Sequence, residues 1–269
     1  MIQTPKNISP SSTSLSFLSK WQKIIDKEST YELQVLKAKN TWGKSNKTMD
    51  DVKSKLRQMS NNTSRCNYCE DSYSDEIEHI YPKDLYPEKT YVWDNYIYAC
   101  GPCNGPKSNK FSLINSNNEL IDITPPRIKP ENYVYTRPPK LPAALINPRD
   151  EDPLHYLMLD IITTFYFVPT PNLTPFEEKK AKFTIEVLRL NEREYLVEAR
   201  KQAYGNFISR IKEYKQAKID SRSQNELDQM KSNLLRLNHI TVWEEIKRSR
   251  NHIPEITNLF NSIPEVINW

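Results

Sequence analysis

Apolar side chains recur every three or four positions near both ends of the chain, with charged residues between them. This spacing puts the apolar side chains on one face of a helix, and it therefore predicts a mostly helical chain. The predicted helices cover residues 14–27, 30–40, 49–60, 174–190, a long segment from 191, 225–236 and 240–250.

Polar residues at the expected helix starts support three of these helices. Thr174, Pro175 and Glu177 have the order of an N-cap, a first-turn proline and a capping-box acid. Thr48 is a predicted cap for the third helix, and the segment from Asn191 repeats the capping pattern.

The segment 61–111 has a different pattern. Turn-forming residues, cysteines and aromatic residues replace the helical spacing, and two short β-like runs stand out at Asp75–Ile80 and Tyr96–Cys100. A short helix is predicted at Cys103–Phe111. This segment is therefore expected to be a small hairpin-and-helix module.

The segment 112–175 holds 11 of the 19 prolines. Proline fixes φ and lacks a backbone donor, so an irregular wrapping segment is expected here, with one short helix at Pro153–Thr164. The expected fold is α+β, with a small core that a bound metal ion stabilises inside a mostly helical chain. The expected parts are N-terminal helices (1–60), the metal-binding module (61–111), the proline-rich segment (112–175) and C-terminal helices (176–269).

The composition is that of a folded, well-hydrated protein of 269 residues. Hydrophobic residues make up 37%, and the aromatic share of 10% is too high for a disordered chain. No apolar run has the length of a membrane span, and the N-terminal segment lacks a signal-peptide layout. A cytoplasmic location is therefore expected, where the four cysteines stay reduced.

Charge is unevenly distributed along the chain. Residues 1–60 carry 11 Lys and Arg against 5 Asp and Glu, residues 61–111 carry 5 against 8, and residues 176–250 carry 17 against 12. Basic flanks around an acidic centre suit a protein that binds phosphates outside and a cation inside. The same charges also fit helix faces that are simply solvated.

All four cysteines fall in two Cys-x-x-Cys pairs, Cys66 with Cys69 and Cys100 with Cys103. Two such pairs are the ligand set of a tetrahedral structural zinc site. Gly101 and the nearby Gly105 are two of only four glycines, and they are expected to supply positive φ at the second knuckle. Unlinked buried cysteines and a redox pair are the alternatives, but no thioredoxin-like pattern surrounds them.

The residues between and after these pairs resemble the HNH nucleases. The acid-His-x-x-Pro signature is Glu78 to Pro82, the internal asparagine is Asn95, and the closing Cys-x-x-Cys-Asn-x-x-Lys element runs from Cys100 to Lys107. The resemblance implies a ββα-metal fold, a hairpin followed by a helix. The sequence departs from the commoner pattern with Glu in place of Asp before the histidine and Asn in the third position.

The resemblance implies a role for each signature residue. Glu78 and Asn104 would be oxygen ligands of a catalytic Mg²⁺ or Mn²⁺, and His79 would be the general base that activates water. Adjacent strand residues such as Glu78 and His79 point to opposite faces unless the strand end turns them. Asn104 also has a simpler interpretation as a helix cap.

Three further residues have supporting roles by the same resemblance. Asn95 would orient His79, and Lys107, one turn after Asn104, would contact a phosphate, as would Lys110. Alternatively, Asn95 is a turn residue and the lysines are solvated helix charges.

A looser resemblance extends to the HNH nucleases of Septu-type and retron-linked anti-phage systems. It rests on Cys66-Asn-Tyr-Cys-Glu70, Val92-Trp-Asp-Asn95 and Thr184-Ile-Glu-Val-Leu-Arg-Leu-Asn191. It implies a bacterial defence role and a partner ATPase of the SMC/ABC kind.

The sequence leaves two functions open. The first is a nuclease acting on DNA, or on RNA such as tRNA. The second is a non-catalytic module in which zinc supports a nucleic-acid or protein contact surface. The joint presence of Glu78, His79, Asn95 and Asn104 favours the nuclease, because a scaffold needs only the cysteines.

Overall fold

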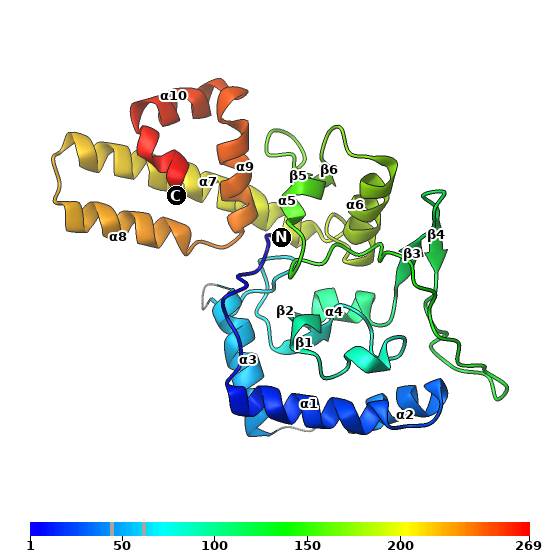
Figure 1. Ribbon diagram of the computed structural model, residues 1–269. Helices are drawn as coiled ribbons and strands as arrows, with labels where there is room; N and C mark the ends of the chain where they lie inside the picture. Colours follow the sequence, from blue (N-terminus) through cyan, green and yellow to red (C-terminus); the bar gives the residue numbers. More distant parts are fainter. Residues whose placement is uncertain (44–45, 61–62) are drawn as a thin grey trace.

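The computed structural model describes residues 1–43, 46–60 and 63–269 (Figure 1). The predicted α+β class is confirmed, and positions 61 and 62, at the expected start of the metal-binding module, lie outside the described residues. The helices are α1 (Ser12–Asp26), α2 (Tyr31–Thr41), α3 (Lys47–Met59), α4 (Gly101–Lys107), α5 (Pro153–Tyr156), α6 (Pro175–Val187), α7 (Glu194–Ile219), α8 (Gln224–Leu235), α9 (Ile240–Arg248) and α10 (Pro254–Ser262). Within the described ranges, no helix is both long enough and apolar enough to cross a bilayer.

The strands form short antiparallel hairpins. They pair as β1 (Glu76–His79) with β2 (Tyr96–Ala99), β3 (Ser112–Ile114) with β4 (Leu120–Asp122), and β5 (Leu157–Leu159) with β6 (Phe167–Pro169). The β1–β2 hairpin followed by α4 is the ββα unit that the sequence predicts, and Figure 1 places it at the centre of the molecule.

The N-terminal helices pack beneath this unit. Leu18 and Ile25 of α1 and Leu56 of α3 belong to a buried cluster that also contains Tyr96 and Tyr98 of β2. The helices α1, α2 and α3 therefore support one face of the β1–β2 hairpin, as Figure 1 shows.

Helix capping follows the sequence prediction at one site and departs from it at two. The capping box of Thr174 and Glu177 is confirmed. Helix α3 starts earlier than predicted, because the side chain of Asn46 caps it and Thr48 lies inside its first turn. Asn191 caps no helix. Its side chain bonds to the backbone N–H and C=O of Phe167 instead, at 2.8 Å each.

The proline-rich segment is more regular than predicted, because it contains the hairpins β3–β4 and β5–β6. The helix predicted at 153–164 is wrong beyond Tyr156, where β5 begins. Leu157 and Leu159 are buried, and the amide of Leu159 donates to the Glu245 carboxylate at 3.1 Å. Burial against the C-terminal helices therefore favours the strand.

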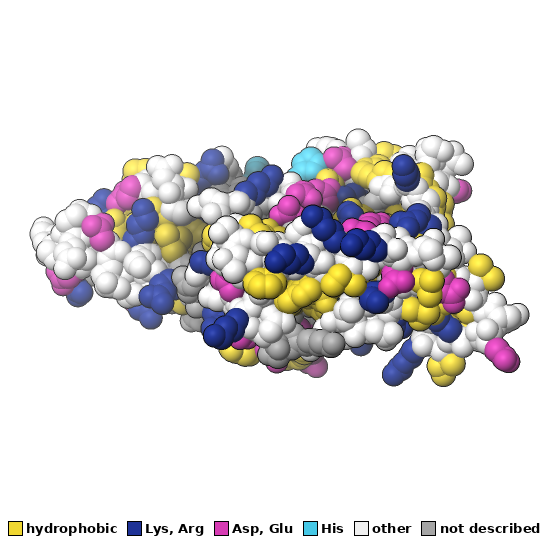
Figure 2. Space-filling view, turned by 60° about the horizontal axis from the view of Figure 1, so that its bottom comes forward, with side chains coloured by type: hydrophobic (Ala, Val, Ile, Leu, Met, Phe, Trp, Pro, Cys, Tyr) yellow, Lys and Arg dark blue, Asp and Glu magenta, His cyan; other side chains and the backbone are white. Residues whose placement is uncertain are grey.

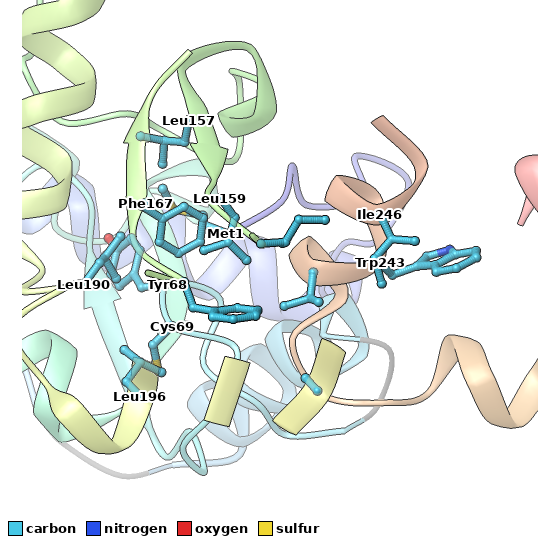
Figure 3. Packing of buried hydrophobic residues seen from close by; sticks show 14 of the residues in the cluster. Met1, Tyr68, Cys69, Leu157, Leu159, Phe167, Leu190, Leu196, Trp243 and Ile246 are labelled. Atoms are coloured by element: carbon cyan, nitrogen blue, oxygen red, sulfur yellow. The ribbon is translucent and has the colours of Figure 1, made fainter. Parts of the chain in front are cut away.

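One hydrophobic core joins the ββα unit to the C-terminal helices (Figure 3). Tyr68 and Cys69 come from the loop before β1, and Leu196 and Trp243 come from α7 and α9. The other labelled members are Met1, Leu157, Leu159, Phe167, Leu190 and Ile246. The helices α7 and α9 therefore pack against the loop that carries the first cysteine pair.

Candidate active site and metal centre

The four cysteine sulfurs converge on one point. They lie within 4.8 Å of one another, all four residues are buried, and the sulfurs of Cys69 and Cys100 are 3.8 Å apart. Tetrahedral geometry with zinc–sulfur bonds of about 2.3 Å puts sulfurs about 3.8 Å apart, whereas a disulfide would hold them at about 2 Å. The predicted cysteine set therefore fits a single zinc ion.

The backbone around this cluster has the turns of zinc knuckles. The carbonyl of Cys66 accepts from the amide of Glu70 at 2.8 Å, and Glu70 has a φ of 63°. The prediction that Gly101 and Gly105 supply positive φ is wrong, because both lie within α4. A Cβ on Gly101 would lie 3.5 Å from Oε1 of Glu76, which is an ordinary van der Waals contact, so the start of α4 lies directly beside this carboxylate.

A guanidinium group from the C-terminal region contacts the cysteine cluster. Nη2 of Arg193, at the start of α7, donates to Sγ of Cys103 at 3.3 Å. Four thiolates around one Zn²⁺ would carry excess negative charge, which this cation would offset. No local sequence pattern identifies Arg193, because it lies 90 positions after its partner.

The β1 strand directs its side chains to two sides. Glu76 and Glu78 alternate with Ile77 and His79, as the pairing of β1 with β2 requires. The imidazole of His79 packs against Trp42, with ring centroids 4.2 Å apart. Glu78 and His79 therefore leave opposite faces of the strand, and they approach a common space only where β1 ends.

The backbone around His79 defines its protonation. Nε2 lies 2.9 Å from the carbonyl oxygen of Thr90. A carbonyl only accepts hydrogen bonds, so Nε2 carries the proton and Nδ1 of the neutral ring keeps its lone pair. Burial, together with the nearby cation of Lys83, lowers the pKa of His79 to about 3. The imidazole is therefore neutral near pH 7, in the form that can accept a proton.

Asn95 organises the loop between the strands without bonding to His79. Its side-chain oxygen accepts from the amide of Tyr81 at 2.8 Å, and its Nδ2 donates to the carbonyls of Tyr81 and Lys89 at 3.0 Å each. The direct contact implied by the family resemblance is thus replaced by an indirect one. Asn95 fixes the loop that carries Thr90, and the Thr90 carbonyl contacts the imidazole.

Lys107 occupies a different place from the predicted phosphate contact. Its side chain is fully buried, and its ammonium donates to Oε1 of Glu78 and, at 2.9 Å, to the carbonyl of His79. Burial raises the pKa of Glu78, and the Lys107 cation opposes that shift. The inner face of α4 therefore holds Lys107 against β1, where it is enclosed by protein and away from solvent.

Glu76 is the carboxylate that contacts Asn104. Nδ2 of Asn104 donates to Oε2 of Glu76 at 2.6 Å. Glu76 is not among the site residues predicted from the sequence, although strand periodicity places it two positions before Glu78 and on the same face. That periodicity was the signal that could have identified it.

These groups line one open cleft of about 260 Å³ at the end of β1, beside α4. The cleft brings together three residues predicted from the sequence, Glu78, His79 and Asn104. Two unpredicted residues, Glu76 and Lys83, also line it. Lys83 forms no ion pair with any described residue, whereas Lys110 is exposed and does not line the cleft.

Comparison with known proteins identifies the same segment. The family model of the HNH endonucleases matches residues 66–110. The chain is also 36% identical over 121 residues to the Septu protein PtuB of Bacillus thuringiensis. The aligned stretch covers 41% of this chain and 43% of that protein, so the match spans less than half of the relative. The chain therefore contains, at residues 66–110, a domain of the HNH endonuclease family.

Proposed function

We propose that this protein is a metal-dependent endonuclease that hydrolyses phosphodiester bonds in DNA. The observation that carries the proposal is the shared cleft, in which a neutral imidazole, two carboxylates and a carboxamide meet. A zinc scaffold without catalysis needs none of these four groups. The match to the HNH endonucleases supports the same activity.

In the proposed mechanism His79 is the general base. Its Nδ1 lone pair accepts a proton from the water that attacks the phosphate, while the Thr90 carbonyl holds the other nitrogen. The side-chain hydrogen bonds of Asn95 to Tyr81 and Lys89 hold the loop that carries this carbonyl. The imidazole therefore starts each reaction unprotonated and oriented.

The cleft oxygens suit a hard divalent cation. Glu76 and Asn104 are already in contact, and Glu78 uses Oε1 for Lys107, which leaves its Oε2 as a further donor. Mg²⁺ or Mn²⁺ takes few protein ligands and completes its shell with water and phosphate oxygens. When bound, the ion would stabilise negative charge on the phosphate and the leaving oxygen.

Lys83 takes the phosphate-binding role that the sequence suggested for Lys107 and Lys110. It lines the cleft, is only partly buried, and forms no ion pair with a described residue. An ammonium in this position can contact a phosphate oxygen of the bound strand.

We further propose that the protein is the nuclease effector of a bacterial anti-phage system and acts in the cytoplasm. The named relative is a Septu protein, and 36% identity over 121 residues supports a related role. The family resemblance adds an SMC/ABC-type ATPase as the expected partner, which would hold or license the nuclease.

A cleavage assay tests the proposal. The full chain is incubated with plasmid DNA and separately with total RNA, in Mg²⁺ or Mn²⁺, with and without proteins that co-purify with it. Wild-type protein is expected to cut DNA and the His79→Ala variant is expected to be inactive. If the protein cuts only RNA, the proposed substrate is RNA and not DNA. If the wild-type protein cuts neither under any condition, the result supports the non-catalytic module in which zinc supports a contact surface.

A further inference from the structure

A second, larger cavity of about 570 Å³ adjoins the proposed catalytic cleft. It lies between α1, α3, the end of α2 and the start of β1. The two hollows share lining residues, including Trp42, Glu76 and Asn104. Its volume is within the range of small-molecule sites, and the proposed mechanism gives it no role.

Aromatic rings form much of the cavity wall. The rings of Trp21 and Tyr91 are 5.3 Å apart, and those of Trp42 and Tyr91 are 5.6 Å apart. Trp21 and Trp42 are only half-buried, so part of each ring is accessible. Ile24, one turn after Trp21 on α1, also lines the cavity and remains 47% exposed. Flat apolar walls of this kind suit a planar aromatic ligand.

The described polar groups of the cavity disfavour a phosphate as that ligand. Among the residues that the structure describes, Asp50, Asp75 and Glu76 line it together with one lysine, Lys53. This excess of carboxylates repels an anion, but it can accept hydrogen bonds from the amino groups of a neutral nucleobase.

The surface beside the cavity can carry a nucleic-acid backbone. Figure 2, which brings the α1 side forward, shows a band of hydrophobic side chains with lysines and arginines next to it. Lys20 and Lys23 of α1 are exposed, as is Lys53 at the rim. A basic surface for phosphates next to an aromatic site for bases is the usual arrangement for binding single strands.

We propose that this cavity binds an unpaired nucleobase of the substrate strand next to the scissile phosphate, with Trp21 as its stacking platform. The proposal rests on the proposed nuclease function, because the base is placed by a strand whose phosphate lies in the adjoining cleft. The protein then prefers substrates with an unpaired nucleotide at the cut site, such as single strands or loops of DNA or RNA.

Removal of single bases tests this proposal on the full chain. The cut site of the wild-type protein is mapped on single-stranded DNA and RNA oligonucleotides, and each nucleotide near the cut is then replaced by an abasic one. One abasic position is expected to lower kcat/KM about tenfold to a hundredfold, the usual effect of losing one stacked base.

The variant Trp21→Ala separates stacking from a structural role. It is expected to lower kcat/KM on the intact oligonucleotide by a similar factor and to lose the sensitivity to the abasic position. Trp21→Phe restores most of the rate, and Tyr166→Ala, at an exposed tyrosine outside the cavity, leaves it unchanged. The proposal would be overturned if Trp21→Ala lowered kcat/KM equally on the intact and the abasic oligonucleotide. It would also be overturned if no abasic position lowered kcat/KM of the wild-type protein.

A binding measurement keeps this test separate from catalysis. Fluorescence anisotropy of the full-length His79→Ala chain compares a labelled single-stranded oligonucleotide with an abasic strand of equal length, without added divalent ions. About tenfold tighter binding of the strand with bases is expected, and this difference disappears when Trp21→Ala is added. Equal affinity for the two strands contradicts the base site, whereas absence of cleavage alone contradicts only the nuclease function.

Discussion

The cysteine site and the proposed catalytic cleft are neighbours along α4, yet their chemistry differs completely. Cys100 and Cys103 lie at the start of the helix, and Asn104 follows directly. The cysteine site is buried and contains only soft sulfur donors, whereas the cleft is open and holds oxygen and nitrogen groups. The first site fixes the start of α4, and the fixed helix then places Asn104 in the second.

The largest expected effect comes from breaking the cysteine site. A structural zinc contributes on the order of 10 kcal/mol to folding, which is comparable to the whole stability of many proteins. The variant Cys103→Ser, or removal of metal by a strong chelator, is therefore expected to unfold the ββα unit and abolish activity. Zinc analysis and thermal unfolding check this, and an unchanged unfolding temperature after zinc loss would contradict it.

A substitution in the cleft, by contrast, is expected to leave the fold intact. His79→Ala removes the proposed base and should lower kcat about a hundredfold to ten-thousandfold, with one zinc per chain retained. His252→Ala, at an exposed histidine outside the cleft, is the matched control. Cleavage kinetics and zinc analysis measure the two quantities. A His79→Ala protein that cuts as fast as wild type would show that His79 is not the general base.

The ion pair of Lys107 and Glu78 links the two sites, because it holds α4 on β1. Lys107→Ala leaves a buried carboxylate unpaired and is expected to reduce stability by about 3 to 5 kcal/mol. The double variant Glu78→Leu with Lys107→Met should recover most of this loss, since neither charge remains. Denaturant unfolding measures both, and normal stability with weakened DNA binding in Lys107→Ala would favour the phosphate role predicted from the sequence.

The smallest expected effect concerns Lys83, which lines the cleft and forms no ion pair with a described residue. Lys83→Ala should lower kcat/KM about tenfold and reduce the slope of log affinity against log salt by about 1. Lys201→Ala, at an exposed lysine on α7, should change neither quantity. A larger loss for Lys110→Ala than for Lys83→Ala would favour the sequence-based assignment over the cleft geometry.

Local chemistry made the core of the domain predictable. The spacing of the cysteine pairs predicted their convergence, and strand periodicity predicted that Glu78 and His79 leave opposite faces. The capping box at Thr174 was predictable for the same reason, since all its partners lie within one turn.

Contacts between distant segments were not predictable in this way. A lysine one turn after Asn104 fits a phosphate contact as well as a buried ion pair, until the position of Glu78 is known. The Thr90 carbonyl at His79 and the Arg193 guanidinium at Cys103 depend on loops whose paths no local pattern encodes. The strand β5 was missed because burial against α9 overrides its local helical pattern.

We propose that this domain has two distinct metal centres, a closed one that holds the fold and an open one that serves catalysis. Anomalous X-ray scattering from crystals of the full chain soaked in Mn²⁺, recorded at the zinc and manganese edges, tests it most directly. We expect a zinc peak among the four cysteine sulfurs and a separate manganese peak in the cleft beside Glu76 and Asn104. A single metal peak at the cysteines, with none in the cleft when a phosphodiester is bound, would contradict it.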